Sequence, residues 1–278
     1  MQSFGSVWTV QKLDAVGRYL SAYTKIMKNQ KFKLCYIDAF AGSGSILLKD
    51  GQTIDGSAIR ALNYPFKKFY FFEKDKAHFD ALVKKIENHP RRDDIEVRNT
   101  DCNEKLSQID RYGWREKNWR GVIFLDPYAM HLTWEMLERI SRTGIFDMWY
   151  LFPFMAVSRN LFNDGQMLEE TRARLNQILG CTDWEAEIYK KSPQMNLFET
   201  VDYEKADVEG VKQYIIRRLK ETFPTVASNP ALLRNEKNSP VFLLCFAGSN
   251  PDAKAQDTSL RVANHILAHI QEGELHGA

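Results

Sequence analysis

A glycine-punctuated turn directly after an apolar strand constrains the fold of this chain more than any other feature. Residues 36–45 read Tyr-Ile-Asp-Ala-Phe-Ala-Gly-Ser-Gly-Ser, so strand-forming residues give way to Asp38 and then to Gly42 and Gly44. Because glycine has no Cβ, such a turn can bend sharply and lie close against a ligand. A strand, a glycine-rich turn and a helix in succession are typical of α/β folds that bind nucleotide-like cofactors.

The residues around the glycines argue against a dinucleotide or a nucleoside triphosphate. The dinucleotide fingerprint has a third small residue where this chain has Leu47, and the Gly-Lys-Ser or Gly-Lys-Thr of a P-loop does not follow. The acid instead precedes the glycines. An acid that opens the turn suits a ligand with an ammonium group and no phosphate, such as S-adenosylmethionine (SAM). A turn that binds no ligand is the alternative interpretation.

A second motif lies far downstream, at residues 121–128, which read Gly-Val-Ile-Phe-Leu-Asp-Pro-Tyr. The apolar run predicts a strand buried on both faces, and Pro127 ends its hydrogen-bonding ladder. Asp126 and Tyr128 then stand at the carboxyl end of that strand, where open α/β sheets place their active sites. Methylation of an exocyclic base amine needs an acceptor for the N–H and an aromatic face for the ring. We predict that Asp126 is the acceptor and Tyr128 the face.

Together the two motifs resemble those of class I SAM-dependent methyltransferases that act on amino groups of nucleic-acid bases. More closely, the chain resembles the three-Cys-motif partner protein (TcmP) family, over about residues 8–250, through its Tyr-Ile-Asp-x-Phe-Ala-Gly and Leu-Asp-Pro-Tyr segments. The resemblance implies a seven-stranded, mostly parallel, Rossmann-like methyltransferase sheet with helices on both faces. It also implies a partner protein with a cysteine motif like that of radical-SAM proteins. The chain has Ala129 where the family has glycine, and one proline where the established amino-methyltransferase signature has two.

Composition sets broad limits on the class of protein. The 278 residues, 44% of them apolar, suit a single α/β domain with a full core, and a net charge of +2 does not by itself predict nucleic-acid binding. The four cysteines have no metal-ligand spacing and no Pro-Cys occurs, so we expect a reduced, cytoplasmic protein without a nucleophilic cysteine. No apolar run is long enough to span a bilayer, and we expect no membrane partner.

Hydrophobic periodicity predicts alternating strands and helices, and hence a parallel sheet with right-handed crossovers. Predicted strands are 34–39, 68–73, 95–99, 121–125, 147–152 and 241–247, and predicted helices are 8–28, 56–63, 76–88, 102–110, 133–142, 165–179, 183–190, 211–222 and 253–270. Residues 1–33 form an N-terminal helical extension. Residues 154–210, with a polar loop at 192–196, form a helical insertion or cap over the active-site mouth, and 46–55 is a long loop.

Several residues are predicted to hold the cofactor. Glu73 ends the second strand, where nucleotide-binding folds place an acid on the ribose hydroxyls. Asp101 follows the third strand and either accepts from the adenine amino group or caps the next helix; Asn103 is the competing adenine contact. Asp38 orders the glycine turn or reaches the ammonium group through water. The turn itself supplies the remaining contacts, from Phe40, Ala41, Gly42 and Gly44, with Phe40 beside the methionine moiety.

The acceptor side is predicted to contain Asp126, Pro127 and Tyr128 as the catalytic loop, with Arg159 and Trp134 as substrate contacts. Arg159 can hold a substrate phosphate or form a structural ion pair. We expect the two motifs, nearly ninety positions apart, to meet at one cleft. The predicted function is SAM-dependent N-methylation of an amino group, foremost of a nucleic-acid base. Methylation of a protein or small-molecule amine, and a non-catalytic or SAM-binding partner subunit, are the alternatives.

Overall fold

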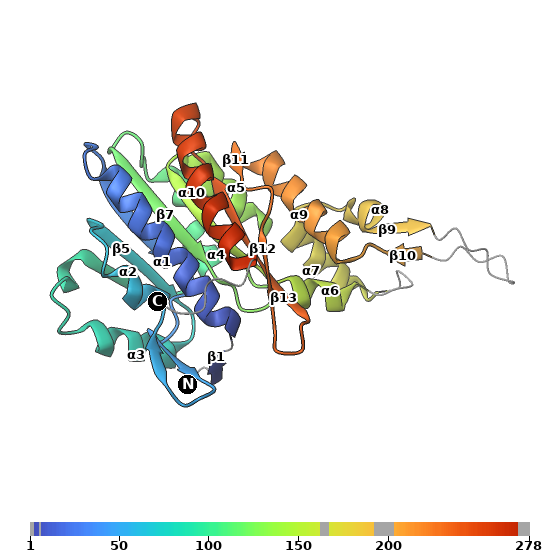
Figure 1. The fold of residues 1–278 in the computed structure, drawn as a ribbon, viewed down its shortest axis with the longest axis horizontal. Helices are drawn as coiled ribbons and strands as arrows, with labels where there is room; N and C mark the ends of the chain where they lie inside the picture. Colours follow the sequence, from blue (N-terminus) through green and yellow to red (C-terminus); the bar gives the residue numbers. More distant parts are fainter. Residues whose placement is uncertain (1–2, 6, 162–166, 192–202, 272–278) are drawn as a thin grey trace, which may run out of the picture.

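The computed structural model describes residues 3–5, 7–161, 167–191 and 203–271. A mostly parallel β-sheet forms its centre and helices cover both faces (Figure 1), so the predicted Rossmann-like α/β fold is confirmed. The strands of this sheet are β2 (Lys33–Asp38), β5 (Lys68–Glu73), β6 (Ile95–Asn99), β7 (Trp119–Leu125), β8 (Phe146–Phe152), β11 (Thr225–Val226), β12 (Ala231–Arg234) and β13 (Pro240–Gly248).

The strand order places a topological switch in the middle of the sheet. The order is β11-β13-β8-β7-β2-β5-β6, and β12 also pairs with β13, which makes eight strands on seven positions. Strands β6, β5, β2, β7 and β8 are parallel, whereas β13 runs antiparallel to β8. The chain leaves β2 in one direction through β5 and β6 and returns on its other side with β7 and β8. Ligands bind at such a switch, at the carboxyl ends of the strands.

The helices divide between the two faces according to the alternating side chains of the strands. On β2, Tyr36 joins one hydrophobic cluster and Cys35 and Ile37 join the other. Helices α1 (Val7–Met27), α2 (Ser57–Ala61), α3 (Lys76–Ile86) and α10 (Ala253–Gln271) pack on the Tyr36 face. The opposite face carries α4 (Cys102–Leu106), α5 (Trp134–Thr143), α6 (Phe154–Asn160), α7 (Glu169–Leu179), α8 (Trp184–Ile188) and α9 (Val208–Thr222), and the short helices η1 (Arg92–Asp94) and η2 (Ile109–Arg111) lie in connections.

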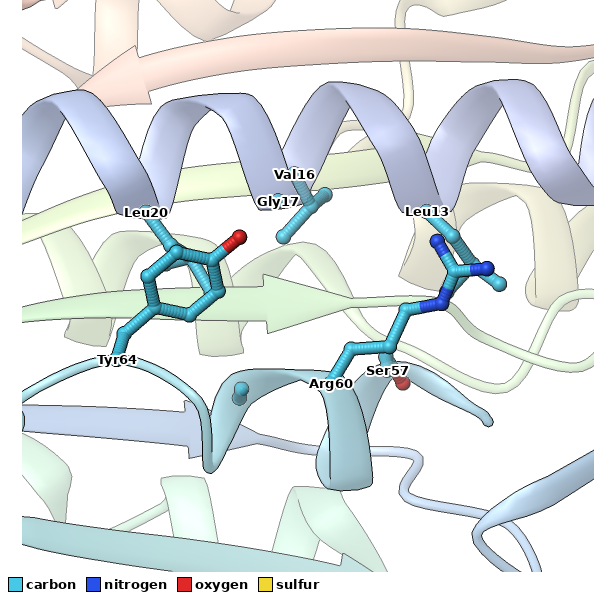
Figure 2. A pocket seen from close by; sticks show the side chains of 8 residues that line it. Leu13, Val16, Gly17, Leu20, Ser57, Arg60 and Tyr64 are labelled. Carbon is cyan, nitrogen blue, oxygen red and sulfur yellow. The ribbon is translucent and has the colours of Figure 1, made fainter. Parts of the chain in front are cut away.

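Helix α1 is held on the sheet by polar contacts as well as by its apolar stripe. The Tyr19 hydroxyl donates to Oδ2 of half-buried Asp147 on β8 at 2.6 Å, and desolvation of the carboxyl group raises the pKa of Asp147 to about 6. Arg60 of α2 donates to Asp14 at 2.8 Å. Figure 2 shows Arg60 and Tyr64 beside α1 next to Gly17, where an added Cβ would lie only 3.2 Å from the Tyr64 hydroxyl. These contacts fix the position of α1 along its axis.

Several segments differ from the sequence prediction, and two of them form short sheets separate from the central one. The expected loop 46–55 is a hairpin of β3 (Ser45–Leu48) and β4 (Thr53–Asp55), and β1 (Ser3–Gly5) pairs with β3. The expected helix 183–190 ends at Ile188 and continues as β9 (Tyr189–Lys191), which pairs with β10 (Tyr203–Lys205). These strands are three or four residues long, too short for a period-two pattern to stand out.

The described residues of the segment 154–210 lie mostly away from the mouth of the fold. Helices α7 and α8 pack against α5 and α9, and with β9 and β10 they extend to one end of the molecule (Figure 1). Of the described residues in this segment, only members of α6 reach the cleft analysed below. The expected loop 192–196 and the first two residues of the expected helix 165–179 lie outside the described residues. Among the helices described, none combines the length and apolar character needed to cross a membrane.

Candidate functional site

A cleft of about 1150 Å³ opens at the carboxyl ends of β2, β5 and β7. It contains residues of both sequence motifs, because Asp38 and Phe124 are register partners on adjacent strands and the N–H of Ala39 donates to the Phe124 carbonyl at 3.1 Å. The predicted site residues that line the cleft are Phe40, Ala41, Gly42, Gly44, Glu73, Asp101, Asp126, Pro127, Tyr128 and Arg159. Asp38, Asn103 and Trp134 are not among the lining residues.

The glycine turn forms one wall of the cleft and is held against β5. Gly42 and Gly44 both have positive φ, 61° and 75°, a region that glycine adopts at little cost. The N–H of Gly42 donates to Oε2 of Glu73 at 2.8 Å, and the N–H of Ala41 donates to the Phe72 carbonyl at 2.9 Å. Glu73 therefore fixes the turn as well as facing the cleft.

Glu73 retains the capacity to bind a ligand. Its Oε1 accepts from the N–H of Asp75 at 2.7 Å and its Oε2 from the N–H of Gly42. Each carboxylate oxygen can accept a second hydrogen bond. The long spacing between the glycines and Glu73 is explained by the β3–β4 hairpin, which lies between the turn and α2.

Asp38 lies beneath the turn and is fully buried. It accepts from the N–H of Phe40 at 3.3 Å and from the Tyr36 hydroxyl at 3.4 Å. Burial raises the pKa of Asp38 to about 7, although hydrogen bonds from Ser57 and Phe40 oppose the shift. Of its two predicted roles, the geometry fits that of ordering the turn. Its other predicted role, a contact with the ammonium group through water, stays a prediction.

Asp101 and Asn103 have structural partners. Asp101 caps α4 by accepting from the N–H of Asn103 at 2.9 Å, and Lys74 binds its other oxygen at 2.9 Å. Burial alone would raise the pKa of Asp101, but these bonds outweigh it and lower the pKa. Asn103 donates to the His131 carbonyl at 2.7 Å and so joins α4 to the loop after β7. Asp101 still faces the cleft, whereas Asn103 does not.

Asp126 is paired with a lysine that the sequence analysis did not single out. Its Oδ2 binds Nζ of Lys12 on α1, and the two side chains are only 23% and 7% exposed. Oδ1 of Asp126 has no hydrogen-bond partner among the residues that the structure describes. Lys12 shares the buried stripe of α1 with Val16, Tyr19 and Tyr23, at spacings of four, three and four. The position of Lys12 on this apolar stripe can be recognised in the sequence and indicates a buried lysine that needs a partner.

Aromatic rings complete the wall on the α1 side. Lys12 Nζ lies 4.8 Å from the centroid of the Trp8 ring, and Trp8 lies 4.8 Å from Phe242 of β13. Trp8, Lys12 and Phe242 all line the cleft. A cation over an aromatic face is held electrostatically. The side of the cleft that holds Asp126 is thus built partly from α1 and β13, two elements that carry neither motif.

The loop after Asp126 turns outward. Tyr128 is 77% exposed and stacks on His131, with ring centroids 5.8 Å apart. Ala129 has φ of 50°, the left-handed region that favours the glycine found here in the TcmP family. Arg159 on α6 is exposed and has no ion pair or hydrogen bond within the described part of the chain.

The prediction that Trp134 contacts the substrate is wrong. The side chain is 1% exposed, and its Nε1 donates to the Thr222 hydroxyl of α9 at 3.1 Å. Its ring lies against Gly180, where an added Cβ would be 2.4 Å away, and Arg218 lies over its face. Trp134 begins α5 and points into the core between α5, α7 and α9 rather than toward the cleft.

Comparison with known proteins identifies the fold. No protein-family model and no curated protein matches the sequence. A solved Legionella pneumophila protein described under the family DUF519 is 13% identical, with a TM-score of 0.51 over 95% of this chain and 93% of its own. A Listeria monocytogenes protein described as a candidate SAM-dependent methyltransferase is 13% identical, with a TM-score of 0.41 over 85% and 98%. A spermidine synthase bound to the transition-state analogue AdoDATO is 12% identical, with a TM-score of 0.46 over 98% and 68%. The likeness to the Legionella pneumophila protein, at a TM-score of 0.51, shows a shared fold and no more, and the resemblance to TcmP stays a prediction.

Proposed function

We propose that this protein is a SAM-dependent N-methyltransferase that acts on an amino group of a nucleic-acid base. One observation carries the proposal: a single cleft contains both the glycine turn after β2 and the Asp-Pro-Tyr loop after β7. Its volume of about 1150 Å³ exceeds the ~300–1,000 Å³ typical of a site for one small ligand. The cleft therefore has room for a methyl donor and for an acceptor of nucleoside size.

The turn side of the cleft fits the chemistry of SAM. SAM presents hydrogen-bond donors, namely ribose hydroxyls, an adenine amino group and an ammonium group, and it has no phosphate. Glu73 and Asp101 supply carboxylate acceptors on this side. We assign the ribose to Glu73, the adenine amino group to Asp101 and the methionine moiety to the turn around Phe40. When bound, SAM supplies an electrophilic methyl group carried on a sulfonium sulfur.

Asp126 is assigned to the acceptor. Its Oδ1, which has no partner in the described part of the chain, accepts a hydrogen bond from the amino N–H, which raises the electron density on nitrogen. With SAM bound, the amino nitrogen would take the methyl group while the electrons of the S–C bond would stay on sulfur, and Asp126 would accept the amino proton and release it to solvent. Tyr128 at the mouth offers a stacking face, and Arg159 offers a cation for a substrate phosphate.

The test is Asp126→Asn, with Asp257→Asn on the exposed surface of α10 as the matched control. We expect Asp126→Asn to keep its affinity for S-adenosylhomocysteine (SAH) and to lower methyl transfer to DNA or RNA oligonucleotides by ~100-fold or more, the scale of positioned acid–base groups. Calorimetry and transfer of a labelled methyl group measure the two effects. Undiminished turnover would contradict the catalytic assignment, and absence of SAH binding would contradict the cofactor assignment.

The acceptor class is tested by salt. Binding of a polyanion should weaken steeply as salt rises, whereas methylation of a small amine should not. A SAM-binding partner subunit is the second candidate, and the outward position of Tyr128 favours it. Clear SAH binding without transfer to nucleic acid or protein would support that alternative.

A further inference from the structure

Lys12 and Asp126 form an ion pair inside the cleft, on the side opposite the glycine turn. The lysine side chain is 7% exposed and reaches Asp126 from α1, which Tyr19 and Arg60 hold on the sheet. Lys12 lies over Trp8 as well, so its head group has two fixed neighbours. A lysine this deeply buried is unusual unless it is paired, and here the pair lies where the acceptor binds in the proposed function.

The charges around Asp126 decide which amines the cleft can accept. Asp126 carries a negative charge that a protonated amine would seek, but Lys12 already neutralises it. Asp38, beneath the floor of the cleft, interacts electrostatically with both Lys12 and Asp126. Tyr36 adds only a neutral hydroxyl. An added cation would meet Lys12 in a poorly solvated place, where like charges repel strongly.

We propose that Lys12 selects the class of acceptor: by neutralising Asp126 from within the cleft, it admits a neutral aromatic amino group and rejects a protonated alkylamine. The inference rests on the proposed function for the position of the acceptor. Alkylamines of the lysine type are protonated at neutral pH, with an ordinary pKa near ~10.4. Exocyclic amines of nucleobases are neutral and still offer an N–H to Oδ1 of Asp126, which has no partner among the described residues. The residue thus separates nucleobases from protein lysines and polyamines.

The experiment measures binding of n-butylammonium by calorimetry at low ionic strength, with and without saturating SAH. Lys12→Met removes the charge at nearly the same length, Lys12→Arg keeps it, and Lys25→Met changes an exposed lysine on the same helix. We expect no measurable binding to the wild type, Lys12→Arg or Lys25→Met. Lys12→Met leaves the carboxylate uncompensated, so its affinity should rise by about tenfold or more. The gain should disappear in Lys12→Met/Asp126→Asn.

Two results would overturn the inference: equal binding of butylammonium by wild type and Lys12→Met, or a gain that persists without the Asp126 carboxylate. Lys12→Gln is a second neutral variant should Lys12→Met unfold, and thermal melting checks both. The proposed function fails separately. If butylammonium binds as predicted but the wild type methylates no nucleobase, the inference about Lys12 holds and only the proposed methyltransferase activity is contradicted.

Discussion

Asp38 gives a prediction about stability that can be worked out from its surroundings. Burial raises its pKa from 3.8 to about 7. A carboxyl group with a raised pKa in the folded state binds a proton more tightly there than in the unfolded chain. Its contribution to stability is therefore fully present below pH ~4 and is lost as the pH rises through ~7. A shift of about three units at ~1.36 kcal/mol each corresponds to ~4 kcal/mol.

Asp38→Asn removes this titration while keeping a carbonyl oxygen for the N–H of Phe40. The free energy of unfolding should fall for the wild type relative to Asp38→Asn by up to ~4 kcal/mol between pH 4 and pH 8. Urea unfolding of both proteins across this range measures the difference. Carboxyl groups whose pKa is lowered, such as Asp101, change the stability with the opposite sign. Subtracting the two curves cancels their contribution because both proteins contain them.

The matched control is Asp257→Asn, which alters an exposed carboxylate on α10. A difference between wild type and Asp38→Asn that varies no more with pH than that of the control would refute the reasoning. So would a wild type that gains stability relative to Asp38→Asn as the pH rises. Either result would mean that the carboxyl group beneath the glycine turn is better solvated or better paired than its burial implies.

Two further predictions concern single side chains. Glu73→Gln replaces two acceptor oxygens by one, so the N–H of either Gly42 or Asp75 loses its partner. The affinity for SAH, measured by calorimetry, should fall by ~10-fold or more. An affinity equal to that of the exposed control Glu87→Gln would contradict the assignment of the ribose to Glu73. Trp134→Ala should lower the free energy of unfolding by ~3–5 kcal/mol through lost packing. If Trp134→Ala instead lost acceptor binding at an unchanged free energy of unfolding, Trp134 would be a substrate contact after all.

The sequence predicted the inner strands of the central sheet well because they are largely buried on both faces. Strand β5, for example, reads Lys-Phe-Tyr-Phe-Phe-Glu and was expected at 68–73, where the structure has it. A continuous apolar run bounded by charges leaves one interpretation in an alternating α/β pattern. The meeting of the two motifs was predictable for the same reason: adjacent parallel strands end at the same edge of the sheet, and β2 lies beside β7.

Side-chain direction was harder to predict than position along the chain. Trp134 and Arg159 both follow a strand that ends at the cleft, yet Trp134 points into the core while Arg159 lines the cleft. Distance along the chain from the preceding strand does not distinguish them, because Trp134 follows β7 and Arg159 follows β8 at similar spacings. The rotation of the first turn of α5 does, and it depends on α7 and α9, which pack there from elsewhere in the chain. Tertiary packing of this kind leaves no local pattern.

Lys12 shows how an N-terminal helix that looked like an extension becomes part of the candidate site. The basic residues of α1 suggested a solvated face, and most of them are exposed, but Lys12 falls on the apolar stripe with Val16 and Tyr19. A charge on that stripe is tolerated only if something buried compensates for it. The compensating group is the one carboxylate that the downstream motif had already marked for chemistry, Asp126. The buried lysine of α1 and the carboxylate after β7 therefore explain one another. Lys12 needs a nearby anion to be buried, and Asp126 needs a fixed cation beside it if it is to bind only neutral amines.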